Sequence, residues 1–396
     1  MQDDMRSDLP LAGVTVVELG DSASAPFAGQ ILAGLGAEVW KVERPTGDSS
    51  RGWGPSQWRG SGAAFHALNR GKRSICLDIK DRVQLATLHD LIERHTDVFL
   101  HNLRPGSAHQ YRLDPESLRQ RKPGLVVCEV GAYGHVGPLN KLPGYDPLMQ
   151  AFAGIMSLTG EEGQAPVRAG VSIVDFGTGM WAVIGIVSAL LRRERRQIGA
   201  TVNSSLLETA IAWMSVGVAN YAADGEPGGR HGSGVAFIVP HRAYEAADGH
   251  AIISAANDRL FARLCEALGH PEWASDARFA TNAARLAHRK EIDTLIGQRM
   301  KQHTRDYWQK HLDGYGLPCA SVQTTAELVA HAQTRALGIL GKSREDEIAL
   351  VGMPLSFDGQ RPPPLDSAPG IGQDDERLRQ RLLRAANKTK EGCEHR

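Results

Sequence analysis

Over residues 1–130, short apolar runs alternate with segments in which apolar residues recur every three or four positions. Runs of the first kind predict buried strands, and segments of the second kind predict helices. The strands are expected at 14–19, 38–43, 74–79, 97–103 and 125–130, and the helices between them include 26–35 and 82–95. Repeated strand–helix–strand units predict an α/β fold in which helices cover a parallel sheet, with ligands beyond the carboxyl ends of the strands.

The pattern changes after a glycine-rich segment at 223–234. Two strand-like runs flank Asp248-Gly249, a pair typical of hairpin turns, and helices are expected at 258–268, 290–300 and 304–312. We therefore predict a large domain with a Rossmann-like parallel sheet, whose first part is residues 1–222, and a smaller α+β domain over 223–330.

The stretch 167–191 concentrates apolar residues around one carboxylate. The apolar run 171–174 leads to Asp175, a flexible Gly177-Thr178-Gly179 turn follows, and a helix that is apolar almost all round is expected over 180–191. A helix without a polar face is buried, so Asp175 would lie near the free N–H groups of a buried helix. It is then either an N-cap or linker carboxylate, or a nucleophile or general base in a semi-apolar cleft.

Charge and cysteine content narrow the class of protein. Lys and Arg together number 45, as do Asp and Glu, so we expect no nucleic-acid partner and no anionic membrane surface. We expect no signal peptide, because the chain starts with acidic and polar residues, and no membrane span, because the apolar helix at 180–191 is too short. The five cysteines are far apart and odd in number, which favours a reducing compartment and predicts a cytoplasmic protein.

Common cofactor motifs are missing. The turn after the first strand reads G-D-S-A-S-A-P rather than G-x-G-x-x-G, and the chain has no P-loop, C-x-x-C or H-E-x-x-H pattern, so we predict no nicotinamide site and no metal site. Basic residues do follow or precede the strands, at Arg44, in 69–73 and in 101–106. Three such clusters on one sheet would hold a polyphosphate by charge-assisted hydrogen bonds, or would form an ordinary solvated surface.

Several stretches, in this order and spacing, resemble the family III CoA-transferases, the group that contains formyl-CoA transferase, carnitine CoA-transferase and succinyl-CoA–glutarate CoA-transferase. They are L-A-G-V-T-V-V-E-L (11–19), L-G-A-E-V-W-K-V-E-R-P (35–45), G-D-S-S-R-G-W-G-P (47–55), L-N-R-G-K-R-S-I (68–75), D-V-F-L-H-N-L-R-P-G (97–106), G-Y-D-P (144–147) and D-F-G-T-G (175–179). The resemblance covers roughly residues 11–365, and P-V-R-A-G-V before Asp175 is similar to the succinyl-CoA–dicarboxylate branch.

The resemblance implies that Asp175 is the catalytic residue. In the family, the aspartate at this position attacks an acyl-CoA to give a mixed anhydride, the CoA thiolate returns to form an aspartyl-CoA thioester, and an acceptor acid repeats the exchange. CoA thioesters are then substrates, and no tightly bound cofactor or metal is needed. Contacts to CoA are implied for Ala23, Ser24, Arg44, Leu68, Asn69, Arg70, Asn102, Leu103, Arg104, Tyr145 and Asp146.

The resemblance also implies a homodimer of two interlocked, ring-like subunits, in which the C-terminal segment, 331–396, returns to the large domain and ends in a tail. Formyl-CoA transferases carry a glutamine where this chain has Ala23, and a glycine loop where it has 254–257. These departures argue against formyl-CoA and oxalate as substrates and favour succinyl-CoA with a carboxylic or dicarboxylic acid.

Two alternatives stay open. The same fold hosts 2-methylacyl-CoA racemases, which use a histidine where this chain has Tyr145, so racemisation would lack a base. The chain could also be a non-catalytic CoA-binding subunit, which the retained Asp175 disfavours.

Overall fold

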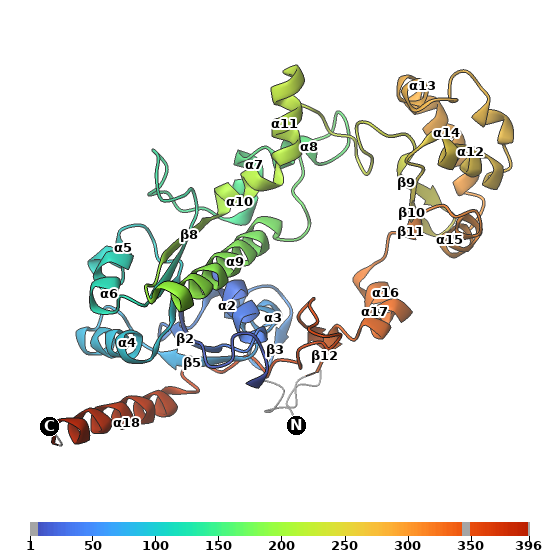
Figure 1. Cartoon of the computed structure of the whole chain (residues 1–396). Coiled ribbons are helices and arrows are strands. Elements are labelled where there is room, and N and C mark those ends of the chain that lie inside the picture. Colours follow the sequence, from blue (N-terminus) through green and yellow to red (C-terminus); the bar gives the residue numbers. More distant parts are fainter. Residues whose placement is uncertain (1–6, 343–348, 395–396) are drawn as a thin grey trace. The chain divides into compact units, whose positions relative to one another are not determined.

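The computed structural model describes residues 7–342 and 349–394, and the chain divides into two compact units (Figure 1). Unit 1 contains the residues up to Ala153, Gly170–Ser215 and the residues from Gln333 onward, and unit 2 contains Gly154–Ala169 and Val216–Ala332. Each unit has a hydrophobic core of its own.

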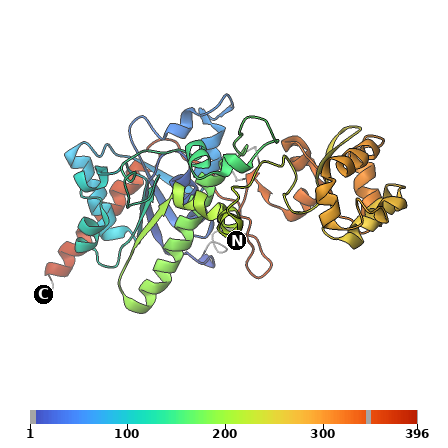
Figure 2. The same cartoon turned by 90° about the horizontal axis from the view of Figure 1, so that it is seen from above.

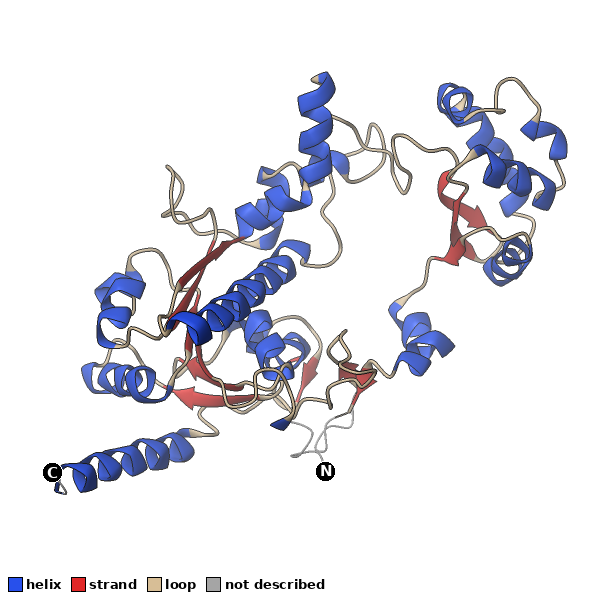
Figure 3. Ribbon diagram, viewed as in Figure 1, coloured by secondary structure: helices blue, strands red, loops and turns tan. Residues whose placement is uncertain are grey.

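Unit 1 is built on a six-stranded sheet in the order β5-β2-β1-β6-β7-β8, and all of its strand pairs are parallel (Figure 3). Its strands are β1 (Thr15–Leu19), β2 (Glu38–Glu43), β5 (Lys72–Cys76), β6 (Val98–His101), β7 (Val126–Gly131) and β8 (Thr201–Ser205). The predicted α/β fold with a parallel sheet is confirmed.

Helices cover both faces of this sheet. Successive residues of a strand point to opposite sides, so neighbouring residues of β1 belong to different hydrophobic cores. Val16 belongs to a core shared with α2 (Ser24–Gly34) and α9 (Ile173–Arg196), whereas Val17 belongs to a core shared with α4 (Arg82–His95) and α18 (Asp375–Glu394). Figure 2 shows the sheet between these layers. The other short elements of unit 1 are η1 (Ser49–Gly52), β3 (Gln57–Trp58), β4 (Ser61–Gly62), α3 (Ala63–Asn69), α5 (Ser107–Gln110), α6 (Pro115–Arg121), α7 (Asp146–Phe152), α10 (Leu206–Trp213), β12 (Leu340–Gly341) and β13 (Leu350–Val351).

The stretch around Asp175 differs from the prediction in three ways. Residues 171–174 form no strand, α9 already begins at Ile173, and the expected Gly177-Thr178-Gly179 turn is helical. A β-carbon on Gly177 would lie 2.6 Å from the Trp213 ring, and one on Gly179 would lie 2.8 Å from the Ser24 carbonyl oxygen. The glycines therefore serve close packing of α9 against its neighbours, which outweighs their low helix propensity.

The remainder of α9 is neither short nor wholly buried. It has 24 residues and exposes an apolar face made of Met180, Trp181, Ile184, Val187 and Leu191. By length and composition alone α9 is able to cross a membrane, so the expectation that this apolar helix is too short was wrong; half of its most apolar stretch is buried within the protein.

Unit 2 contains an antiparallel sheet in the order β11-β10-β9, formed by β9 (His241–Ala246), β10 (Gly249–Ser254) and β11 (Cys319–Ser321). The hairpin predicted at Asp248-Gly249 is confirmed by the pairing of β9 with β10. Its helices are α8 (Ile155–Leu158), α12 (Asp258–Ala267), η2 (Pro271–Ala274), α13 (Asn282–Ala287), α14 (Arg289–Met300), α15 (Arg305–Gly314) and α16 (Thr325–Ala330). Two further helices, α11 (Ser215–Asp224) and α17 (Ala332–Leu337), begin at the junctions between the units.

The C-terminal segment closes the β5 edge of the large sheet. Asp374 accepts a hydrogen bond from the Ser74 N–H at 3.0 Å, and Asp375 accepts one from the Cys76 N–H at 2.8 Å. Unpaired N–H groups of an edge strand are otherwise open to pairing with other chains. These two carboxylates therefore occupy N–H groups of the edge strand and attach the C-terminal segment to β5.

Candidate active site

A cavity of about 710 Å³ lies at the carboxyl ends of the strands of unit 1. Loops that follow β1, β2, β5, β6 and β7 line it, together with Tyr145 and Asp175. This is the position at which parallel α/β sheets bind ligands. The cavity is the first candidate for a substrate site.

Asp175 lies in the first turn of α9, where the first N–H groups have no partner within the helix. Its Oδ1 accepts a hydrogen bond from the hydroxyl of Ser24 at 3.1 Å, and Ser24 is the first residue of α2. Burial raises the pKa of Asp175 to about 6; the Ser24 hydrogen bond opposes this shift and the negative charge of Asp146 adds to it. A carboxylate that is poorly solvated yet opens onto a cavity is suited to act as a nucleophile.

Asp146 holds the start of α9 in place. Its Oδ2 accepts hydrogen bonds from the Val174 N–H at 2.7 Å and from the Asp175 N–H at 3.2 Å, and Oδ1 accepts one from Gln150 at 2.5 Å. Asp146 is only 2% exposed and is not among the cavity-lining residues. Asp146, which belongs to α7, therefore caps the start of α9 at Asp175.

Asp21 joins the loops that form the cavity wall. Its carboxylate accepts hydrogen bonds from the N–H and the hydroxyl of Ser49, both at 2.7 Å, and from the Arg44 guanidinium at 3.0 Å. The Asp21 N–H donates to the Asn102 side-chain oxygen at 3.0 Å, and the Asn102 amide donates back to the Asp21 carbonyl at 2.7 Å. Arg44 is thereby held at the cavity with its guanidinium partly exposed, a good position for a phosphate contact.

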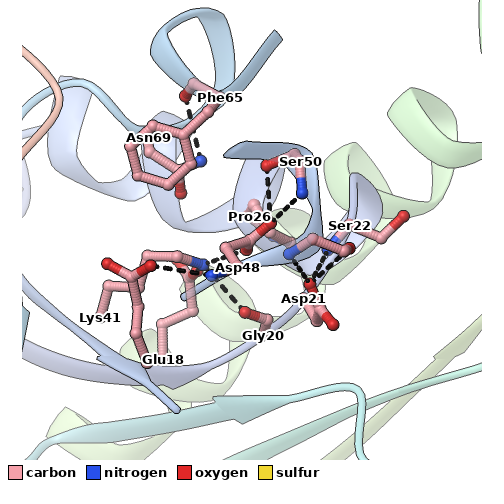
Figure 4. Close-up of polar contacts among 12 residues, drawn as sticks. Glu18, Gly20, Asp21, Ser22, Pro26, Lys41, Asp48, Ser50, Phe65 and Asn69 are labelled. Atoms are coloured by element: carbon pink, nitrogen blue, oxygen red, sulfur yellow. Dashed lines mark hydrogen bonds and ion pairs between the residues drawn. The ribbon is translucent and has the colours of Figure 1, made fainter. Parts of the chain in front are cut away.

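A group of charges whose side chains are fully buried includes Glu18, Lys41 and Asp48, which lie near Gly20 (Figure 4). Glu18 pairs with Lys41 at 3.0 Å and with Lys72 at 2.7 Å, and Lys41 also pairs with Asp48 at 2.7 Å. Although burial lowers the pKa of Lys41, the negative charges of Glu18 and Asp48 outweigh it and raise this pKa.

The same lysines also hold backbone carbonyls. Lys41 donates to the Gly20 carbonyl at 2.8 Å, and Lys72 donates to the Pro26 carbonyl at 2.7 Å. These bonds fix the backbone on either side of Ser24.

The other residues implied by the family resemblance fall into two groups. Ser24, Arg44, Asn102, Leu103, Arg104 and Tyr145 line the cavity with Asp175. Ala23, Leu68, Asn69, Arg70 and Asp146 are buried and are not among its lining residues. Asn69 bonds the Phe65 carbonyl and Lys72, and Arg70 contacts the Val351 carbonyl, so their observed partners belong to the fold. Contact of any of these residues with CoA stays a prediction.

Several polar residues at the cavity were not predicted from the sequence, and Asp21 and Lys80 are among them. Lys80 directly follows the strand predicted at 74–79, so the rule that ligands bind beyond the strand ends could have identified it. No local signal marks Asp21 as the residue that joins the loops, because its partners come from two distant strand ends.

Comparisons with known proteins agree with one another. The model of the family described as CoA-transferase family III matches residues 11–375. The chain is 37% identical over 338 residues to a succinate–glutarate CoA-transferase of Agrobacterium fabrum, covering 83% of this chain and 84% of that protein.

The chain is also 36% identical over 327 residues to a succinyl-CoA–D-citramalate CoA-transferase of Chloroflexus aurantiacus, and the match covers 82% of this chain and 81% of that protein. Its structure is similar to the crystal structure of a CaiB/BaiF family protein from Brucella suis, with a TM-score of 0.87, 35% identity, and coverage of 94% and 99% of the two chains.

Proposed function

The chain belongs to CoA-transferase family III, and on that premise we propose that it moves CoA from an acyl-CoA donor to a carboxylic or dicarboxylic acid through covalent intermediates on Asp175. The observation that carries this proposal is the position of Asp175, a mostly desolvated carboxylate at the start of a helix that opens onto a 710 Å³ cavity. Succinyl-CoA is the proposed donor, because the names of both similar transferases pair succinate with a dicarboxylic acid.

The first step is an attack by a free oxygen of Asp175 on the thioester carbonyl of the donor. The bond from carbon to sulfur breaks, CoA leaves as a thiolate, and a mixed anhydride joins the acyl group to Asp175. A carboxylate is a suitable nucleophile because the anhydride keeps the acyl group activated. Burial favours this attack, since a poorly solvated carboxylate loses less hydration when it reacts.

The thiolate then attacks the side-chain carbonyl of Asp175, and the donor acid leaves as its carboxylate. The resulting aspartyl-CoA thioester is attacked by the acceptor carboxylate, which releases the thiolate and gives a second anhydride. Attack of the thiolate on the acceptor acyl carbon yields the new CoA thioester and frees Asp175. No electrons leave the system and no net proton is consumed.

CoA binding is assigned to the positive side chains at the cavity wall. Arg44, Lys80 and Arg104 come from the loops after β2, β5 and β6, respectively. Guanidinium groups form bidentate hydrogen bonds with phosphate, and an ammonium adds a point charge. We assign the CoA phosphates to this group and the acyl end to Asp175.

Two features disfavour the alternative functions. The cavity presents Tyr145 where racemisation requires a base, and a phenol is a much weaker base than an imidazole at neutral pH. A non-catalytic subunit would have no need for a carboxylate seated in an apolar site, which is unfavourable for the charged form.

We also propose that the chain works as a cytoplasmic homodimer with interlocked, ring-like subunits. The exposed apolar face of α9, with Ile211 and Trp213 of α10 also exposed, supports a subunit interface, because such large apolar areas mark association sites. Mass photometry tests the dimer; a monomer at micromolar concentration contradicts it. The free state of Cys76, Cys128, Cys265 and Cys319 supports a reducing compartment.

One experiment tests the function directly. The purified protein is mixed with succinyl-CoA and, separately, with glutarate, citramalate, malate and acetate as acceptors, and new CoA esters are measured by mass spectrometry. The intermediate is trapped with hydroxylamine, which converts an acylated Asp175 to a hydroxamate on an identifiable peptide. Asp175→Ala should abolish transfer and keep CoA binding; transfer by that variant, or a hydroxamate elsewhere, would contradict the proposal.

A further inference from the structure

The two oxygens of the Asp175 carboxylate have different surroundings. Oδ1 accepts the hydrogen bond from the Ser24 hydroxyl at 3.1 Å, whereas Oδ2 accepts no hydrogen bond from any side chain or N–H group that the structure describes. One oxygen is therefore held by a donor, and the other is free to react.

The donor is held firmly. Ser24 is 6% exposed, and its own carbonyl oxygen abuts Gly179 of α9. The helix that it begins, α2, has 11 residues and is anchored by the bond from Lys72 to the Pro26 carbonyl. The first turn of a helix also favours negative charge, because its N–H groups are unpaired and its dipole points its positive end there.

We propose that Ser24 is a catalytic residue whose hydroxyl stabilises the oxyanion formed on Oδ1 each time a nucleophile attacks the side-chain carbonyl carbon of Asp175. This inference rests on the proposed function, because it requires Asp175 to be acylated. It adds a role for the hydroxyl that is separate from any contact of Ser24 with CoA.

In the anhydride, Oδ2 bridges to the donor acyl group and Oδ1 is the carbonyl oxygen. The thiolate forms a bond to Cγ, and the carbonyl electron pair moves onto Oδ1, where the Ser24 hydroxyl donates to it. When that pair returns, the bond between Cγ and the bridging oxygen breaks and the donor acid leaves.

The acceptor carboxylate attacks the same carbon in the thioester, and negative charge again forms on Oδ1 before the thiolate leaves. In the opening step, by contrast, Asp175 is the attacking group and the oxyanion forms on the substrate. Ser24 therefore accelerates the two attacks on Asp175 and not the attack by Asp175, which is a pattern that a merely structural residue would not produce.

The test isolates one of these attacks. Wild-type enzyme and the Ser24→Ala and Ser24→Thr variants are loaded with succinyl-CoA in the absence of an acceptor and freed of ligand. Hydroxylamine is then added as a small nucleophile that attacks the aspartyl thioester, and the loss of the adduct is followed by intact-protein mass spectrometry. We expect a rate about 10²-fold lower in Ser24→Ala, and a rate near wild type in Ser24→Thr, which keeps a hydroxyl.

A spectroscopic readout accompanies the rates. A hydrogen bond weakens a carbonyl bond, so the carbonyl stretch of a ¹³C-labelled aspartyl thioester should move to higher wavenumber in Ser24→Ala and stay in place in Ser24→Thr. Ser204→Ala is the matched control: its hydroxyl contacts the Thr178 carbonyl of α9 at 3.3 Å without touching the carboxylate, so rate and stretch should stay as in wild type.

The outcomes separate the inference from the function. If the wild-type thioester forms and Ser24→Ala leaves both rate and stretch unchanged, the inference is wrong and the function stands. If Ser24→Ala keeps the wild-type Tm and gains the succinyl mass of the anhydride but no CoA adduct, while Ser24→Thr gains the CoA adduct, the first attack by thiolate is slowed and the inference is supported. If Ser24→Ala gains neither mass, the attack by Asp175 itself is lost and the inference is wrong. If no adduct forms on wild-type Asp175, both are overturned.

Discussion

A β-carbon on Gly179 would lie 2.8 Å from the carbonyl oxygen of Ser24, closer than side-chain carbons approach a backbone oxygen in proteins. Gly179 lies four residues after Asp175, so both are on the same face of α9. The close approach of α9 to α2 at Gly179 is what brings the Ser24 hydroxyl within 3.1 Å of the carboxylate.

Replacing Gly179 with alanine should therefore damage the site although alanine is the better helix former. The added carbon meets backbone, which cannot rotate away, and overpacking of this kind costs about 1–3 kcal/mol of unfolding free energy. Urea denaturation measures the loss, and hydroxylamine should attack the aspartyl thioester of this variant more slowly than that of wild type. Gly170→Ala is the control, because a β-carbon there meets nothing within 4 Å; equal stability of the two variants would contradict the packing argument.

The raised pKa of Asp175 predicts how stability depends on pH. Its pKa is about 6 in the folded protein, mainly because of burial, against 3.8 for an ordinary aspartate. At pH values between these two pKa values, the folded state binds more protons than the unfolded state. The contribution of Asp175 to the free energy of unfolding therefore falls as the pH rises from about 4 to 6. Above pH 6 the charged form should cost about 3 kcal/mol.

Asp175→Asn removes this cost. The variant should match wild type near pH 4 and exceed it in unfolding free energy at pH 7, as measured by denaturant titration at both pH values. A variant that is equally or less stable than wild type at pH 7 would show that Asp175 is not held in a desolvating site.

Asp146 should control both the position and the acidity of Asp175. Asp146→Ala removes the acceptor for the Val174 and Asp175 N–H groups and for the Gln150 amide, a loss of about 1–3 kcal/mol. It also removes a negative charge that raises the pKa of Asp175, so the acid limb of the pH–rate profile should move to lower pH.

Asp146→Asn separates these two effects, since it keeps an oxygen acceptor and loses only the charge. It should show the shifted pH profile with a smaller loss of stability. An unshifted acid limb in both variants would mean that the charge of Asp146 is not felt at Asp175.

The sequence predicted those features that depend on local pattern. The strand at Glu38–Glu43 and the helix at Arg82–His95 begin and end at the predicted residues. The family resemblance to CoA-transferases is confirmed as well, because it depends on the order of short motifs along one chain.

The sequence did not predict what depends on contacts between distant residues. The start of α9 was misplaced because glycines ordinarily indicate a turn, whereas here Gly177 and Gly179 make room for Trp213 and Ser24. The bond from Ser24 to Asp175 spans 151 positions, and the cap from Asp146 spans 28. Side chains so far apart leave no periodic signal, so only the folded chain shows that they meet.

The buried charges behind the site give the last prediction. Glu18, Lys41, Asp48 and Lys72 form a set of two negative and two positive groups, and all four are fully buried. Lys72→Met leaves an uncompensated buried negative charge and frees the Pro26 carbonyl of α2. Breaking a buried ion pair from one side costs about 3–5 kcal/mol, so the variant should lose that much unfolding free energy.

In the Lys72→Met variant, nucleophiles should also attack the acylated Asp175 more slowly, because α2 positions Ser24. The double variant Glu18→Gln, Lys72→Met restores electrical neutrality, since Lys41 keeps Asp48 as its partner. The double variant should therefore be more stable than Lys72→Met alone, and a double-mutant cycle by urea denaturation measures the difference. If the two losses simply add, Glu18 and Lys72 are not coupled, and the anchoring of α2 must come from packing alone.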